Sequence, residues 1–285
     1  MAAISETLER LKLFISTPFR SFGSARLFPD ALFGVGDTLK TAYVDALVAE
    51  ITSAAQGMED MLVDEVEFGC GPASSLTSEQ LELLMRTVRK NFQLASDVCV
   101  HACEVPGGLT VDYASFCKNN KMNYLEIEML SANPLALHAE RLPPSVEATV
   151  ACFQVAYFTG APRLGILLDA QLDHDDKAFR RSVREALGRR PFFVRAVGVS
   201  DKYATILRAL CEEHGLAEKP PDHEEADVFT FGQPGFTGPT ARRRNQIGCG
   251  VNSLSTFDGI HFKTTGDIRR YLANSTDFAA IARQL

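Results

Sequence analysis

Short apolar segments alternate along the chain with longer segments whose apolar residues recur every three or four positions. The short segments are typical of buried β-strands and the longer ones of amphipathic α-helices. Breaks rich in Gly, Pro or Ser separate the two kinds. The pattern predicts strands at residues 11–17, 63–68, 98–102, 124–129, 163–168 and 192–199, and helices at 37–55, 78–94, 111–119, 145–158, 175–187 and 201–214.

Six consecutive strand–helix units predict a parallel sheet. Each helix returns the chain to the end of the sheet where the previous strand began, in a right-handed crossover, so the next strand runs in the same direction. We therefore expect an α/β fold, a partial (β/α)6 TIM-like barrel over residues 1–215, with functional loops at the carboxyl ends of the strands. The alternation fails after His214. Residues 216–285 are expected to form a short irregular C-terminal extension with helices near Asp267 and Asp277.

The composition narrows the classes of partner. The 285 residues are 46% hydrophobic and 23% charged, with a formal charge of -7, which is typical of a globular protein that is not attracted to nucleic acid or to an anionic membrane. No apolar stretch reaches the ~20 residues that span a bilayer. The seven cysteines are odd in number and scattered, so we expect a reducing compartment and a cytoplasmic location.

One loop stands out as a candidate ligand site. Gly69, Cys70, Gly71 and Pro72 follow the second predicted strand. Two glycines around one residue leave the main chain bare, so a ligand's amino or carboxylate group can approach it closely. A tight strand-to-helix turn that needs positive φ explains the same glycines equally well. Both interpretations stay open.

Four segments, in order, read LFISTPFR at 13–20, AYVDALVAEI at 42–51, FGCGPASSL at 68–76 and IGCGVNS at 247–253. With their spacing they resemble motifs of the radical SAM family, in the branch of oxygen-independent coproporphyrinogen III oxidases and related heme chaperones. The resemblance implies a TIM-like barrel, S-adenosylmethionine binding and a role in heme or porphyrin metabolism. It also implies a C-terminal helical domain, relative to which residues 216–285 are truncated.

The chain departs from the family at its cluster motif. The resemblance implies three cysteines, spaced CxxxCxxC, that hold a [4Fe-4S] cluster after the first strand. Arg20, Ser24 and Leu27 stand at those positions, and none supplies the thiolate that such a cluster requires. We therefore expect no 4Fe-4S cluster and no metal ligands in this loop. Cys99 and Cys103 form a separate CxxxC on the third strand, so ligation elsewhere stays open.

Other positions implied by the resemblance are only partly kept. The carboxylate of a third-strand motif corresponds to His101 or Glu104, and a Gln-Ser pair after the fourth strand corresponds to Leu130 and Ser131. The loops GCGP and IGCGVNS are expected to line one pocket for a small anionic ligand, S-adenosylmethionine or a tetrapyrrole such as heme. The cofactor-binding candidates are Gly69, Cys70, Gly71, Pro72, His101, Glu104, Ser131, Gly248, Cys249 and Gly250, with Cys70, His101 and Cys249 the first expected contacts to heme or metal.

Three functions follow as hypotheses. The first is a degenerate, non-catalytic relative of the coproporphyrinogen oxidase branch that binds a small molecule. The second is an active oxidoreductase of that branch with unconventional cluster ligation. The third is an interaction subunit that pairs with a true family member as its partner protein. We favour the first, because radical chemistry belongs to the cofactor and the loop at Arg20, Ser24 and Leu27 does not hold it.

Overall fold

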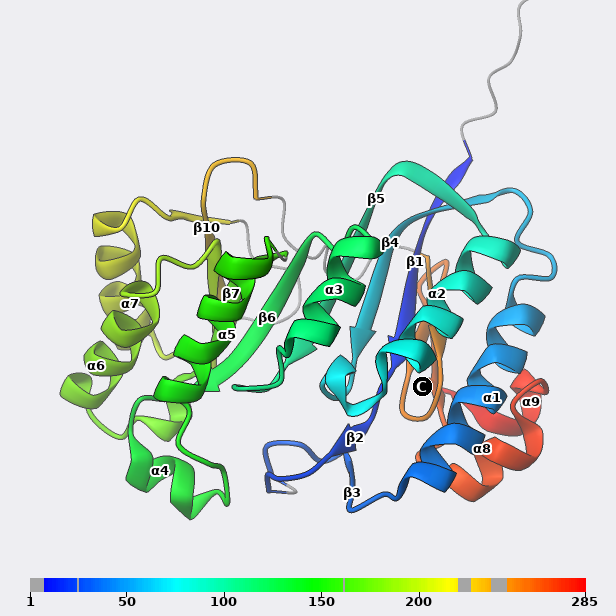
Figure 1. Cartoon of the computed structure of the whole chain (residues 1–285), viewed down its shortest axis with the longest axis horizontal. Helices are drawn as coiled ribbons and strands as arrows, with labels where there is room; N and C mark the ends of the chain where they lie inside the picture. Colours follow the sequence, from blue (N-terminus) through cyan, green and yellow to red (C-terminus); the bar gives the residue numbers. More distant parts are fainter. Residues whose placement is uncertain (1–7, 25, 161, 220–226, 237–244) are drawn as a thin grey trace, which may run out of the picture.

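The computed structural model describes residues 8–24, 26–160, 162–219, 227–236 and 245–285. Its centre is a run of six parallel strands in one sheet (Figure 1). In spatial order these are β1 (Glu9–Ser16), β4 (Met61–Gly69), β5 (Gln93–Glu104), β6 (Tyr124–Leu130), β7 (Arg163–Asp169) and β8 (Phe193–Val197). The connecting helices are α1 (Asp37–Ala54), α2 (Ser78–Asn91), α3 (Val111–Asn119), α5 (Val146–Thr159), α6 (Asp176–Leu187) and α7 (Asp201–Glu213).

The six predicted strand–helix units are confirmed, and most boundaries agree within two residues. The largest difference is β5, which begins at Gln93, directly after α2, where a helix continuing to residue 94 was predicted. At the start of α1, Gly36 is the N-cap and Asp37 lies in the first turn. Helix α2 begins with a capping box, in which Thr77 and Gln80 satisfy each other's backbone N–H groups.

The expectation of an irregular C-terminal extension is wrong, because residues 216–285 add strands to both edges of the sheet. At the β8 edge lie β10 (Phe229–Gly232) and β9 (Ala217–Glu218), both antiparallel. At the other edge β11 (Gln246–Cys249) pairs parallel with β1, followed by β12 (Leu254–Phe257), β13 (Ile260–Thr264) and β14 (Ala282–Gln284). Across the described residues the 12-stranded sheet stays open rather than closing into a barrel.

Short elements complete the fold. The predicted terminal helices are present as α8 (Ile268–Asn274) and α9 (Phe278–Ile281), which lie beside α1 in Figure 1. At the carboxyl ends of the central strands lie β2 (Phe19–Arg20), β3 (Leu32–Phe33), the 3-10 turn η1 (Ala73–Ser75) and α4 (Pro134–Ala139). No helix within the described residues is both long and apolar enough to cross a membrane.

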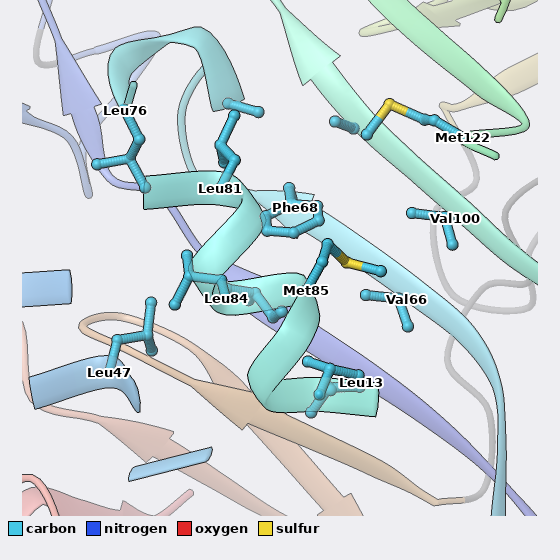
Figure 2. Close-up of a cluster of buried hydrophobic side chains, with 14 of the residues drawn as sticks. Leu13, Leu47, Val66, Phe68, Leu76, Leu81, Leu84, Met85, Val100 and Met122 are labelled. Carbon is cyan, nitrogen blue, oxygen red and sulfur yellow. The ribbon is translucent and has the colours of Figure 1, made fainter. Parts of the chain in front are cut away.

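The main hydrophobic core lies between one face of the sheet and its helices. Figure 2 shows Leu81, Leu84 and Met85 of α2 packed over Leu13, Val66 and Val100, which come from β1, β4 and β5. All six side chains are at most 2% exposed. The odd-numbered face of β1 is therefore apolar and anchors the helices, which leaves the opposite face free for other side chains.

That opposite face is charged. The strand register places Lys12 beside Glu65, and Glu67 beside His101, so these side chains share the face away from the helices. On β6, Glu126 and Glu128 alternate with Leu125 and Ile127, and the strand register puts Glu126 beside Cys103. The sheet is thus apolar on its helix side and ionic on its inner side, and the inner side leads to the carboxyl edge where the candidate site lies.

Candidate functional site

The loop after β1 carries the three positions where the family has cysteines. The Arg20 side chain is only 5% exposed, and its two terminal nitrogens donate to the two oxygens of Glu128 at 2.8 and 2.9 Å. The guanidinium carbon also lies 3.6 Å from the centre of the Phe28 ring. This bidentate, stacked geometry fixes the start of the loop onto β6.

The other two positions also have partners inside the protein. The Ser24 hydroxyl donates to Glu140 at 2.8 Å, and Arg26 donates to the second oxygen of the same carboxylate. These bonds lower the pKa of Glu140. Leu27 packs into a small apolar cluster with Leu130 and Leu137. The loop is therefore held against β6 and α4 by an ion pair, a shared carboxylate and apolar contacts.

The donor chemistry of this loop does not fit an iron–sulfur cluster. Such clusters are held by thiolates, and a guanidinium has only N–H donors with no free lone pair for iron. A serine hydroxyl and a leucine side chain supply no sulfur either. Arg20, Ser24 and Leu27 thus present no ligand set of the kind that the resemblance implies.

A second cluster of charges lies deeper on the inner face. The Lys12 ammonium is 3.1 Å from Glu65 and also contacts Glu67, while His101 Nε2 is 3.1 Å from the same Glu65 oxygen. Burial alone would raise the pKa of Glu67, but the charges of Lys12 and His101 hold it below its usual value. His101 also stacks on the Tyr124 ring, with 5.0 Å between centroids.

Glu65, Glu67 and His101 are also the described side chains best placed to hold a metal ion, with ligand atoms within 4.8 Å of one another. Lys12 occupies the space between the two carboxylates. Because burial opposes charging Lys12 and the two carboxylates favour it, its pKa is raised overall, and it stays an ammonium. The lysine therefore supplies the positive charge that a metal would otherwise bring.

The CxxxC pair on β5 is engaged in the same face. Cys103 Sγ lies 3.8 Å from Glu126, and Cys99 Sγ lies 3.6 Å from the Tyr124 hydroxyl. Burial, followed by the charge of Glu126, raises the pKa of Cys103 well above its ordinary value. A thiol that stays protonated is a poor metal ligand, since coordination requires the thiolate.

The glycines of the loop after β4 are explained by close packing and not by the positive φ of a tight turn, since neither Gly69 nor Gly71 has a positive φ. A Cβ on Gly71 would collide with the backbone oxygen of Thr17, and a Cβ on Gly69 would overlap the Phe14 ring. Cys70 itself adopts φ 64°, and burial raises the pKa of its thiol to about 11. The backbone of the β1 loop therefore fills the close approach that the glycines allow.

Two further candidate residues already have internal partners. Glu104 is fully buried and accepts hydrogen bonds from the Ser74 hydroxyl at 2.7 Å, the Ser74 N–H at 3.1 Å and the Val105 N–H at 2.8 Å. Burial outweighs these donors and raises its pKa to about 7. Ser131 is also fully buried and donates to Asp173 at 2.8 Å.

The segment Gly248, Cys249 and Gly250 is joined to α1 and α8. The Gly250 N–H and the Tyr271 hydroxyl both donate to one oxygen of Glu50, at 2.7 and 2.6 Å. Burial raises the pKa of Glu50 to about 7. Cys249 is fully buried, which raises its thiol pKa well above the ordinary value.

The GCGP and IGCGVNS loops line different cavities among those described, and a pocket shared by both loops stays a prediction. Gly248 and Cys249 line a cavity of about 240 Å³ at the end of α1, beside Phe278 and Ile281 of α9. Pro72 lines a different cavity of about 350 Å³.

The 350 Å³ cavity is the candidate binding site. It lies between the loop after β1, the first turns of α1 and the turn η1, at the carboxyl ends where ligands bind in parallel sheets. The sequence analysis missed Lys40, Ser74 and Ser75 there, since no motif marks them. The lining is formed by Phe19, Arg20, Ser21, Phe22, Gly34, Val35, Lys40, Pro72, Ser74, Ser75 and Val105.

Comparison with solved structures identifies the architecture. Coproporphyrinogen III oxidase (HemN) from Escherichia coli, described as a radical SAM enzyme, superposes with a TM-score of 0.75 over 99% of this chain and 73% of its own, at 16% identity. The chain therefore shares the fold of this radical SAM enzyme. A structure of anSMEcpe with bound AdoMet gives a TM-score of 0.51, 12% identity, and coverage of 71% of this chain and 60% of the other.

Two comparisons by sequence found no match to the chain. No protein-family profile matches the chain, and no curated protein matches it. At 16% identity the likeness to the Escherichia coli enzyme concerns the fold, since function lives in the residues of the site. The mixed α/β sheet expected from the pattern is thereby confirmed, and the fold is the one that the resemblance implies.

Proposed function

We propose that the chain is a cluster-free relative of the radical SAM coproporphyrinogen oxidases, which binds a small molecule and performs no radical chemistry. The observation that supports this most strongly is the Arg20–Glu128 ion pair. Arg20 stands at the first cluster position, and its side chain is buried in a bidentate contact with Glu128. Thiolate ligands are indispensable for a [4Fe-4S] cluster, and the loop offers none.

The ligand-binding part of the proposal is supported by the 350 Å³ cavity at the carboxyl edge. The three residues first expected to contact heme or metal do not converge there. Cys249 lies beside the other cavity, His101 is 4% exposed and bonded to Glu65, and Cys70 has a protonated thiol. We therefore place the ligand against the loop after β1 rather than on those three side chains. The seven free cysteines support a reducing, cytoplasmic setting.

Reconstitution tests the proposal. Purified protein is incubated without oxygen with ferrous iron and sulfide, desalted, and examined for bound iron and for absorption at about 400 nm. We expect no absorption band from a cluster. The iron content should lie far below the value of about four atoms per chain that one [4Fe-4S] cluster requires. A stable band with that iron content would overturn the cluster-free assignment.

A cysteine variant tests the alternative in which a cluster is held by cysteines outside the loop after β1. If wild-type protein takes up a cluster, the same reconstitution is performed on Cys99→Ser/Cys103→Ser. Loss of the band in this variant would assign the cluster to β5 and favour an active enzyme. As a control, Cys211→Ser removes a buried thiol from α7, far from the inner face, and is expected to leave the spectrum unchanged.

A further inference from the structure

Two residues that line the 350 Å³ cavity carry a buried hydrogen-bond donor without an acceptor among the described residues. Arg20, 95% buried at its side chain, uses both terminal nitrogens on Glu128 but leaves its Nε–H without a partner. The Ser75 hydroxyl is buried and has no partner either. Buried donors without an acceptor are rare in native proteins, because leaving one unmade costs about 1–3 kcal/mol.

A positive charge faces the same cavity. Lys40 donates to the backbone oxygen of Ser75 at 2.9 Å and lies 5.9 Å from the Phe19 ring centre. It forms no ion pair with any residue that the structure describes. Its ammonium has two further N–H donors, so it can take up an anion without giving up its bond to Ser75.

The nearby acidic groups do not cancel this charge. Glu128 is neutralised by Arg20, and Glu104 is buried and accepts hydrogen bonds from Ser74 and Val105. The cavity is therefore bordered by one cation without an ion-pair partner among the described residues and by donors. The rest of its lining combines apolar side chains, such as Phe19, Phe22 and Val35, with the polar Ser21 and Ser74. A low-dielectric wall around a cation strengthens its attraction for an anion.

We propose that this cavity binds the carboxylate or phosphate group of a small molecule, held by Lys40, the Arg20 Nε–H and the Ser75 hydroxyl. The inference rests on the small-molecule binding in the proposed function and not on the absence of a cluster. It names the chemistry of the ligand: a compact anionic head on Lys40, Arg20 and Ser75, and an apolar body against Phe19 and Phe22. Carboxylates and phosphates share the acceptor oxygens that such donors recognise.

Isothermal titration calorimetry with full-length protein tests the proposal, with pyrophosphate and citrate as probes and glycerol as a neutral probe. We expect saturable binding of at least one anion, no binding of glycerol, and affinity that falls as salt rises. The stronger of the two anions identifies phosphate or carboxylate as the preferred head group. Absence of saturable binding by both anions at low salt would overturn the proposal.

Variants assign the binding to this cavity. Lys40→Gln keeps a donor for the Ser75 carbonyl but removes the charge, and should weaken anion binding at least about tenfold. Ser75→Ala removes only the hydroxyl and should weaken it about threefold or more. Lys90→Gln makes the same charge change at an exposed position on α2 and should leave affinity unchanged. Equal losses in Lys40→Gln and Lys90→Gln would contradict the assignment.

The two proposals fail in different ways. A reconstituted cluster with anion binding intact would remove the proposed function and leave the anion site standing. A cluster-free protein that binds neither probe would keep the proposed function and remove the anion site. Circular dichroism spectra of each variant, compared with wild type, confirm that a lost affinity does not come from unfolding.

Discussion

Replacing Glu128 by glutamine isolates the contact on which the cluster-free assignment depends. The substitution keeps the shape of the side chain and removes its charge, so the Arg20 guanidinium stays buried without a counter-ion. Its two terminal nitrogens would lose the charge-assisted bonds now measured at 2.8 and 2.9 Å. Breaking one partner of a buried ion pair costs about 3–5 kcal/mol, mostly the penalty for the charge left behind.

The assay is urea unfolding followed by circular dichroism, with the free energy of unfolding taken from the midpoint and slope. We expect Glu128→Gln to lower it by about 3 kcal/mol. The double variant Arg20→Met/Glu128→Leu removes both charges and should recover to within about 1 kcal/mol of wild type. Recovery would show that the loss comes from the unpaired guanidinium and not from altered packing.

The matched control is an exposed pair. Arg208 and Glu218 form a similar two-pronged contact, but their side chains are 44% and 37% exposed. Glu218→Gln should lower the free energy of unfolding by no more than about 1 kcal/mol, because solvent screens the pair. If Glu128→Gln costs no more than Glu218→Gln, the buried ion pair does not fix the loop and the argument fails.

Two further predictions concern the network at the end of β11. The pKa of Glu50 is raised from 4.5 to about 7, so the stability that its protonated form contributes below pH 4.5 is lost as the pH rises through 7. Glu50→Gln should therefore reduce the decline in the free energy of unfolding between pH 4.5 and 8 by about 3 kcal/mol. An unchanged decline would contradict this prediction. Gly250 has φ 98° and no room for a Cβ beside the Tyr43 hydroxyl, whereas Gly57 has φ 82° and open space. Gly57→Ala should therefore cost about 1–2 kcal/mol and Gly250→Ala about 1–3 kcal/mol more in thermal unfolding, and equal costs would refute the steric argument.

The central strands and helices could be predicted because each has a clear hydrophobic period. Residues 111–119 match α3 at both ends, since a Thr110 cap and an apolar face bound the helix. The strands β10 to β14 could not be found in the same way, because each has at most five residues. Their pairing to β8 and β1 comes from contacts distant in sequence, which periodicity does not report.

The candidate site could also be predicted only in part. The loss of thiolates at Arg20, Ser24 and Leu27 was visible in the sequence, but the partner of Arg20 was not, since Glu128 lies 108 residues away. The alternation of Glu126 and Glu128 with apolar residues did carry a signal for a charged inner face. Lys40 had no such signal, because a lysine in the first turn of a helix is usually a solvated side chain.

Reductive cleavage of S-adenosylmethionine tests the central claim most directly. Protein treated with iron and sulfide without oxygen is mixed with S-adenosylmethionine and a strong reductant, and 5'-deoxyadenosine is quantified by chromatography. We predict no more product than in the mixture without protein, because the loop after β1 holds no cluster to deliver the electron. Product that rises in proportion to the protein added would contradict the account.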